Sequence, residues 1–157
     1  MQIKALLLSA IIVIACQSCT KEKLNDHDTI VGSWNIKKII GLNGLGNSAT
    51  LDFATGQYTF KADGSFEYLD GIGILYKGNW SMYETPDQSY TDTDGNFVSD
   101  PAETVLKLDA AANNSVSPPQ KKSADLTGFT IIDANNFTAY QSSNAGFTFV
   151  CSFVRLK

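Results

Sequence analysis

Hydrophobic and polar residues alternate with a period of two along most of the chain that follows Val31. Successive side chains of a β-strand point to opposite faces, whereas an amphipathic helix repeats its apolar residues every 3.6 positions. No stretch of eleven residues carries a convincing helical stripe. The pattern therefore predicts an all-β chain. Eight strands are expected, at residues 32–40, 56–61, 65–70, 74–83, 104–109, 127–133, 136–142 and 146–156.

Turn residues separate these strands and favour hairpins. Gly64 and Asn135 are residue types that tolerate the backbone of a tight turn. Many short strands joined in this way are typical of an antiparallel sandwich or an up-and-down barrel. We predict the eight-stranded barrel, with the β-sandwich as the alternative, because closure removes exposed strand edges. Two longer connections are expected, at 84–103 and 110–125.

The alternation also assigns side chains to the two faces of each strand. The set expected to face inward from the first strand is Trp34, Ile36 and Lys38. The last strand contributes an inward set of its own, namely Phe147, Phe149, Cys151, Phe153 and Arg155. Nine Phe, six Tyr and two Trp make this expected core strongly aromatic. Eight strands enclose a space that side chains can just fill, or that holds one small ligand.

The N-terminus carries a targeting signal. Residues 5–15 form an apolar run broken only by Ser9. The run is shorter than the ~20 residues that span a bilayer, and it has the size of a secretory signal core. It ends Val-Ile-Ala-Cys at Cys16, which resembles the bacterial lipobox, in which the cysteine is lipidated and becomes the first mature residue. We expect Cys16 to be the lipid site, with Cys19 as the alternative.

The resemblance to a lipoprotein divides the chain into three parts. They are a signal peptide at 1–15, a lipidated cysteine with a flexible tether at 16–28, and a barrel domain at 29–157. The residues after Cys19 are similar to the start that sends some Gram-negative lipoproteins to the outer surface. We therefore expect an outer-membrane lipoprotein of the bacterial cell envelope with a palmitate-type anchor. Exposure on the outer surface and a location on the periplasmic face are the two alternatives. The acyl chains would insert into the membrane, with a free energy of binding of about 0.8 kcal/mol per buried methylene.

Several short motifs occur in an order that resembles the lipocalin family. Gly32 and Trp34 open the first strand as Gly-x-Trp, and Arg155 lies near the end of the last. The hairpin at 58–66 and a second Gly-x-Trp at 78–80 agree with this order. The chain looks most like the small lipocalin-like domain of bacterial lipoproteins. The resemblance implies that Gly32, Trp34 and Arg155 close one end of the barrel, with the arginine stacked on the tryptophan.

The same resemblance implies a small hydrophobic ligand inside the barrel. The residues expected to contact it are Tyr58, Phe60, Phe66, Tyr68, Tyr76, Trp80, Phe137 and Phe149. Tyrosine and tryptophan suit this role because they combine apolar area with a polar tip. The alternative is a filled barrel that serves as a structural or protein-interaction module through its long loops. Those loops are 41–50, 84–103 and 110–125.

The composition argues against several other classes of function. The formal net charge is -4 and no basic face is apparent, so nucleic-acid binding is not expected. The single histidine, His27, lies in the polar tether, where we read it as solvated. Cys151 therefore lacks a neighbouring base, and we interpret it as a small buried hydrophobe. We expect a protein that is not an enzyme and needs no cofactor.

One acidic stretch has the spacing of a calcium loop. Oxygen-bearing side chains fall at its positions 1, 3, 5, 9 and 12, which are Asp92, Asp94, Asn96, Asp100 and Glu103. The glycine that an EF-hand requires at position 6 is replaced by Phe97, which excludes an EF-hand. A solvated acidic hairpin loop is the preferred interpretation, and a weak, irregular calcium site is the alternative. No other metal site is expected.

Overall fold

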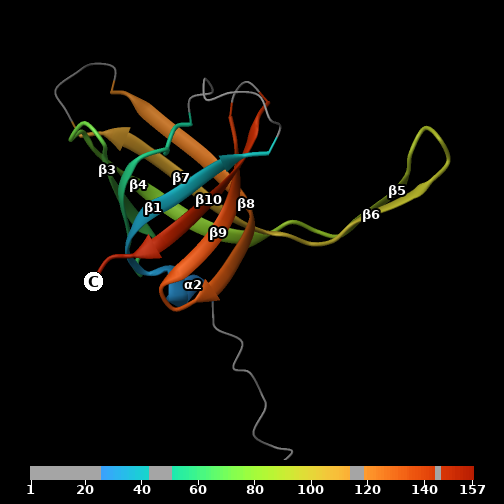
Figure 1. Ribbon diagram of the computed structural model, residues 1–157, viewed down its shortest axis with the longest axis horizontal. Helices are drawn as coiled ribbons and strands as arrows, with labels where there is room; N and C mark the ends of the chain where they lie inside the picture. Colours follow the sequence, from blue (N-terminus) through green and yellow to red (C-terminus); the bar gives the residue numbers. More distant parts are fainter. Residues whose placement is uncertain (1–25, 43–50, 114–118, 144–145) are drawn as a thin grey trace, which may run out of the picture.

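The barrel consists of eight antiparallel strands. The computed structural model describes residues 26–42, 51–113, 119–143 and 146–157, so Cys16 and Cys19 lie outside the described residues. The barrel strands are β1 (Gly32–Gly41), β2 (Gly56–Phe60), β3 (Ser65–Asp70), β4 (Leu75–Glu84), β7 (Thr104–Ala112), β8 (Lys121–Asp133), β9 (Asn136–Ser142) and β10 (Thr148–Arg155). They close in the order β1-β10-β9-β8-β7-β4-β3-β2 (Figure 1). The predicted eight-stranded barrel is confirmed.

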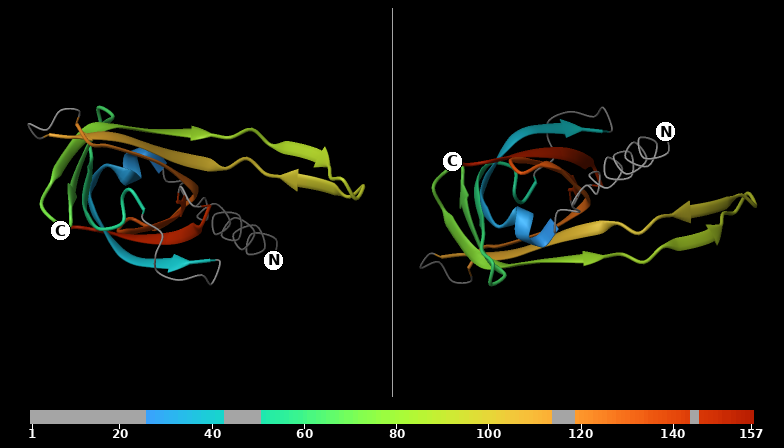
Figure 2. Two further views of the ribbon diagram at one scale, coloured as in Figure 1. Left: turned by 90° about the horizontal axis from the view of Figure 1, so that it is seen from above. Right: turned by 90° about the horizontal axis from the view of Figure 1, so that it is seen from below.

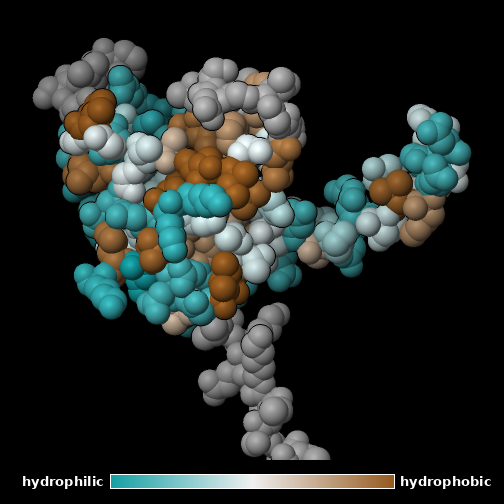
Figure 3. Space-filling view, viewed as in Figure 1, coloured by the Kyte–Doolittle hydropathy of each residue, from teal (hydrophilic) through white to brown (hydrophobic). Residues whose placement is uncertain are grey.

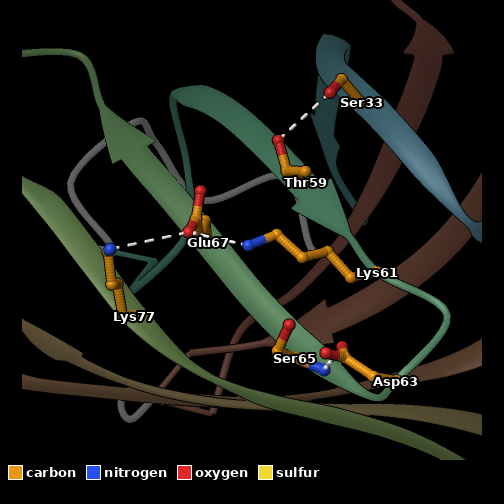
Figure 4. Close-up of polar contacts among 7 residues, drawn as sticks. All are labelled: Ser33, Thr59, Lys61, Asp63, Ser65, Glu67 and Lys77. Carbon is orange, nitrogen blue, oxygen red and sulfur yellow. Dashed lines mark hydrogen bonds and ion pairs between the residues drawn. The ribbon is translucent and has the colours of Figure 1, made fainter.

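Inward-facing residues of all the barrel strands form one aromatic core. Trp34, Tyr58, Phe137 and Phe153 are among the largest fully buried side chains. The opposite faces of the same strands are polar, as β1 to β4 illustrate (Figure 4). There Lys61 and Lys77 place their Nζ atoms 2.9 and 3.7 Å from the Glu67 carboxylate. The two-residue alternation in the sequence therefore corresponds to the inside and the outside of the barrel.

A short helix, α2 (Asp26–Ile30), covers one end of the barrel (Figure 2). Its last residue, Ile30, is buried, and its carbonyl oxygen accepts a hydrogen bond of 2.7 Å from Trp34 Nε1. The expected boundary between tether and barrel at residue 28 therefore falls inside a helix. His27 is also not simply solvated, because its ring stacks on Trp80 with centroids 4.6 Å apart. No helix in the described part of the chain is long and apolar enough to cross a membrane.

The predicted connection at 84–103 is instead a second, two-stranded sheet. Its strands are β5 (Gln88–Thr91) and β6 (Phe97–Asp100), which pair antiparallel and project away from the barrel (Figures 1 and 2). We call residues 84–103 the arm. A hydrogen bond from Thr85 N to Glu103 O continues the pairing of β4 with β7 into its base. The Asp-Gly turn at its tip favours a hairpin. The preferred sequence interpretation of this stretch, an acidic hairpin loop, agrees with the pairing of β5 and β6.

The other predicted connection, 110–125, is shorter than expected. β7 extends to Ala112, and β8 begins at Lys121 rather than at residue 127. The added part of β8 is mostly polar, so its sequence resembles a loop, yet it pairs with β7 from Lys121 to Leu126. A strand whose outer face meets solvent can carry such residues.

β1 contains a bulge that changes the predicted faces. The pairing with β10 shifts register between Ile36 and Lys38, so Ile39, not Lys38, lies opposite the buried Cys151. Lys38 is exposed, whereas Ile36 and Ile39 pack against the core. The prediction that Lys38 faces inward is therefore wrong. One extra residue in a strand reverses the alternation beyond it.

The segment before β2 enters the barrel. We call residues 51–55 the plug. Its Leu51 and Phe53 are buried in the core, and the plug lies within the ring of strands when the barrel is viewed from above (Figure 2). Lys122 Nζ donates a hydrogen bond of 2.7 Å to Asp52 O. This connection is therefore a structural part of the barrel interior.

Candidate functional site

The residues predicted to contact a ligand do gather inside the barrel. Seven of the eight are between 0 and 4% exposed, and Phe149 is half-buried against the same core. They come from β2, β3, β4, β9 and β10, so the barrel brings together side chains that are far apart in sequence. The alternation thus located the interior correctly.

These side chains contact one another. The Tyr58 ring centroid lies 5.0 Å from that of Tyr68, and the Phe60 centroid lies 5.2 Å from Phe66 and 5.5 Å from Trp80. All three separations fall within the range of favourable aromatic pairs. The rings therefore occupy the volume that a ligand would need.

Phe53 of the plug completes this packing. Its ring centroid lies 5.0 Å from Tyr68 and 5.8 Å from Phe66, both in edge-on geometry. An internal cavity large enough for water would leave accessible surface on the side chains that line it. Because the described interior aromatics other than Phe149 have almost none, these side chains are packed as in an ordinary protein core.

The polar tips inside the barrel are also occupied. Tyr58 donates its hydroxyl hydrogen to Phe53 O, and Tyr68 donates to Thr55 O. Trp80 Nε1 donates to Lys61 O over 2.9 Å. These three groups thus already bind backbone carbonyl oxygens, two of them in the plug. The Tyr76 hydroxyl donates instead to Gln120 Oε1 over 3.1 Å.

Gln141 of β9 is the exception among the described residues. Its side chain is buried, and its Oε1 atom has no hydrogen-bond partner. A buried unsatisfied polar atom costs about 1–3 kcal/mol. We predict that Gln141→Leu keeps or raises the free energy of unfolding, by up to about 3 kcal/mol. Urea denaturation measures this, and clear destabilisation would contradict the prediction.

Burial changes the acid–base behaviour of three core groups. It raises the pKa of Tyr58 well above the ordinary 10.0, the pKa of Tyr68 to about 12, and the pKa of the Cys151 thiol to about 11. Cys151 is therefore protonated at neutral pH and is no reactive nucleophile. This agrees with its interpretation as a small core residue.

The raised pKa values predict loss of stability in alkali. As pH rises, the unfolded chain releases these protons first, from near 9.0 for the thiol and 10.0 for the phenols. Stability from these groups is fully present below about pH 9 and falls as pH rises toward the folded-state values. The urea midpoint should be level from about pH 8 to 9 and decrease steadily to about pH 12. A midpoint that stays level throughout would contradict the buried, protonated state.

Trp34 and Arg155 make the contact that the sequence predicts. The guanidinium carbon lies 4.3 Å from the Trp34 ring centroid. The same group donates to the carbonyl oxygens of Thr29, Val31 and Ala134. It thereby joins the chain before β1 to the turn between β8 and β9.

Gly32 is the third residue of this predicted end structure. Its φ of 133° favours glycine, and a Cβ at this position would overlap the Arg155 guanidinium. The Gly-x-Trp motif thus has a physical reason in this fold. Glycine leaves room for the arginine that stacks on the tryptophan.

The five residues with calcium spacing lie on the arm. At its tip, the Asp92 carboxylate accepts hydrogen bonds from the backbone N atoms of Asp94 and Asn96 and from Asn96 Nδ2. Hydrogen bonding to Asn96 lowers the pKa of Asp92. Within the described ranges, no group of three or more His, Cys, Asp or Glu residues is arranged to hold a metal ion. The Asp92 carboxylate is therefore engaged in shaping the turn.

The arm has an unusual surface. It contains six acidic residues and no Lys, Arg or His; the acids are Glu84, Asp87, Asp92, Asp94, Asp100 and Glu103. Phe97 and Tyr90 are nevertheless 74% and 51% exposed on it. Figure 3 shows some hydrophobic surface among hydrophilic surface on the arm, well apart from the barrel. Aromatic residues are enriched at protein–protein contact surfaces.

Among the core residues that sequence reasoning missed are Ile30, Leu51 and Phe53. Ile30 was next to the expected tether, and the other two lie in a segment without a predicted strand. Leu51 and Phe53 are two residues apart, but the buried Tyr58 and Phe60 of β2 are out of step with them, so no continuous alternation marks this segment.

Comparison of the chain with protein-family models, with curated proteins and with solved structures gives no match.

Proposed function

We propose that this protein is a lipid-anchored, lipocalin-like protein of the bacterial outer membrane that binds another protein through its arm. The barrel is the rigid support from which the arm projects. The observation that carries this proposal is the contrast between the interior and the arm. The interior aromatics contact one another and are closed to water, whereas the arm exposes acidic and aromatic side chains. In this role the protein is a binding module and not an enzyme.

The position of the N-terminus supports an anchored arrangement. Asp26 begins α2 at one end of the barrel, and Cys16 precedes it by ten residues. A segment of that length spans at most about 35 Å when fully extended. An acylated Cys16 would therefore hold the α2 end of the barrel near the membrane. The arm leaves the barrel from strands β4 and β7, to the side of this end (Figure 1).

The anchor has its own prediction. Cys16→Ser should abolish metabolic labelling of the protein with palmitate and release it from the membrane fraction, because the lipid is attached to that sulfur. Cys19→Ser, the matched control, should keep both the label and the membrane association. Labelling that persists in Cys16→Ser and disappears in Cys19→Ser would assign the lipid to Cys19.

A second candidate function is the binding of a small hydrophobic ligand in the barrel. It is favoured by the polar contacts of the plug, because Tyr58, Tyr68 and Lys122 donate to its backbone oxygens. A ligand with acceptor oxygens could take over these hydrogen bonds if it displaced the plug. This candidate requires a rearrangement, whereas the arm is exposed in the structure as it stands.

Photo-crosslinking in intact cells tests the proposed function. A benzophenone amino acid replaces Phe97 on the arm, and in a control it replaces Ile72, an 83% exposed residue on the turn between β3 and β4. We expect a discrete crosslinked protein from position 97 and none from position 72. Absence of any adduct at 97, or the same adducts from both positions, would contradict an arm-mediated interaction.

A further inference from the structure

β1 presents an open edge along half of its length. On one side it pairs with β10 from Trp34 to Gly41. On the other side its pairing with β2 ends at Asn35, because β2 begins only at Gly56. Within the described part of the chain, residues 36–41 therefore have a strand neighbour on one side only. Unpaired backbone groups along an edge are a template for adding another strand.

The surroundings of this edge are basic and apolar. Lys37 and Lys38 are exposed, and neither forms an ion pair with a described residue. Ile40 and Leu42 are also exposed, and Figure 3 shows hydrophobic surface over this part of β1. A hollow of about 370 Å³ lies beside it, lined by Asn35, Ile36, Ala54, Thr55, Gly56, Gln57, Leu69 and Asp70. The edge thus offers cations, apolar area and space for a side chain.

The arm has the complementary properties. It is a two-stranded sheet, so both β5 and β6 have an open outer edge. An isolated two-stranded hairpin is only marginally stable in water and gains from pairing with a further strand. Its six acidic residues are opposite in charge to Lys37 and Lys38. Phe97 is exposed on the arm, and its side chain is small enough to enter the hollow.

The arm cannot pair with the open β1 edge of its own chain. It grows from β4 and β7, which lie three and four places from β1 in the closed order of strands. β4 and β7 lie on the wall of the barrel opposite β1, and the arm projects away from the barrel (Figure 2). A second copy of the chain, however, carries the same edge.

We propose that the arm of one copy adds as a strand to the open edge of β1 in a second copy. This inference rests on the proposed function and names the partner. Backbone hydrogen bonds supply the adhesion, and the acidic arm and Lys37–Lys38 select the pairing. The contact joins two different surfaces, so it yields either a reciprocal dimer or an open row of copies on the membrane. The attraction weakens with salt, because both charged surfaces are exposed.

The rival explanation is that the lysines and the bulge protect the edge. Exposed lysines and bulges are devices that prevent strand addition. Under that explanation Lys37→Glu and Lys38→Glu would leave self-association unchanged. Under the proposal the same change removes it, so the two explanations predict opposite results.

The test uses two differently tagged full-length copies expressed together. The measurement is the fraction of one copy that co-purifies with the other from detergent-solubilised envelopes. We expect K37E/K38E to reduce it by about tenfold or more, and D94N/D100N on the arm to do the same. The matched control, K107E/K121E, makes the same charge change at exposed lysines of β7 and β8 and should leave it unchanged.

A charge exchange makes the test specific. D94K/D100K and K37E/K38E copies should each fail to associate with themselves and should co-purify with one another. Equal co-purification of all variants, or no association of the unaltered copies, would overturn the inference. A crosslink from position 97 to a different protein would then leave the proposed function standing. Loss of both results would refute the inference and the proposed function together.

Discussion

Phe53→Ala should lower the free energy of unfolding by about 3–5 kcal/mol, the range for a buried phenylalanine. Phe53 is 1% exposed, and its ring contacts Tyr58, Phe66 and Tyr68. Removal of the ring leaves these aromatics around an apolar void. Such voids stay dry and bind small aromatic molecules. We therefore expect benzene or indole to raise the free energy of unfolding of the variant and not that of the unaltered protein.

Urea denaturation with and without indole provides the measurement. Phe97→Ala is the matched control, because the same ring is removed from an exposed position on the arm. Its effect should stay within about 0.5 kcal/mol. A loss below about 1 kcal/mol for Phe53→Ala, without stabilisation by indole, would mean that the plug does not fill the barrel.

Arg155→Met should destabilise the protein by at least about 3 kcal/mol, because each hydrogen bond to a charged group contributes about 1.5–3 kcal/mol and the cation–π contact about 0.5–2 kcal/mol, contributions that are not additive within one network. The guanidinium donates to three backbone carbonyl oxygens from two parts of the chain and lies over Trp34. Methionine keeps much of the side-chain length and none of these bonds. The end of the barrel that α2 covers should loosen as a result.

Two measurements locate this effect. Urea denaturation gives the loss of stability, and amide hydrogen exchange should be fastest near Trp34 and the turn at 133–136. Arg155→Lys should recover little, because a single ammonium cannot reproduce the planar fork of the guanidinium. Full recovery by lysine would show that charge alone, and not the directed hydrogen bonds, is what matters at this position.

Much of the barrel can be predicted because the alternation that marks each strand is visible within a short stretch of sequence. A strand with one face in the core reveals itself by alternation, as in Tyr58 and Phe60 of β2. The stacking of Arg155 on Trp34 follows from resemblance and from the predicted face of β10. The first is a property of residues within a single strand, and the second joins the neighbouring strands β1 and β10.

The features that could not be predicted depend on distant parts of the chain. Phe53 is buried because the plug turns into the barrel, and no strand pattern announces that path. The bulge in β1 exposes Lys38, since one extra residue exchanges the two faces. The first half of β8 is polar, and only its pairing with β7 makes it a strand.

The sequence predicted where the barrel interior lies but not whether that interior is open or filled. The sequence places eight aromatic residues around one interior, yet it does not specify whether the space between them is open. The packed volume depends on the plug, whose residues lie outside every predicted strand. The arm was expected as one of three loops, and its pairing as a sheet is set by the turn at Asp92.

Ring resonances of the interior tyrosines test most directly whether the barrel is filled and the protein acts through its surface. The experiment labels tyrosine rings with ¹³C and adds saturating fatty acid or indole to the unaltered protein. We predict that the signals of Tyr58 and Tyr68 stay in place, because their rings and hydroxyls are occupied by neighbours and by the plug. Saturable shifts of those two signals would contradict the account and place a ligand in the barrel.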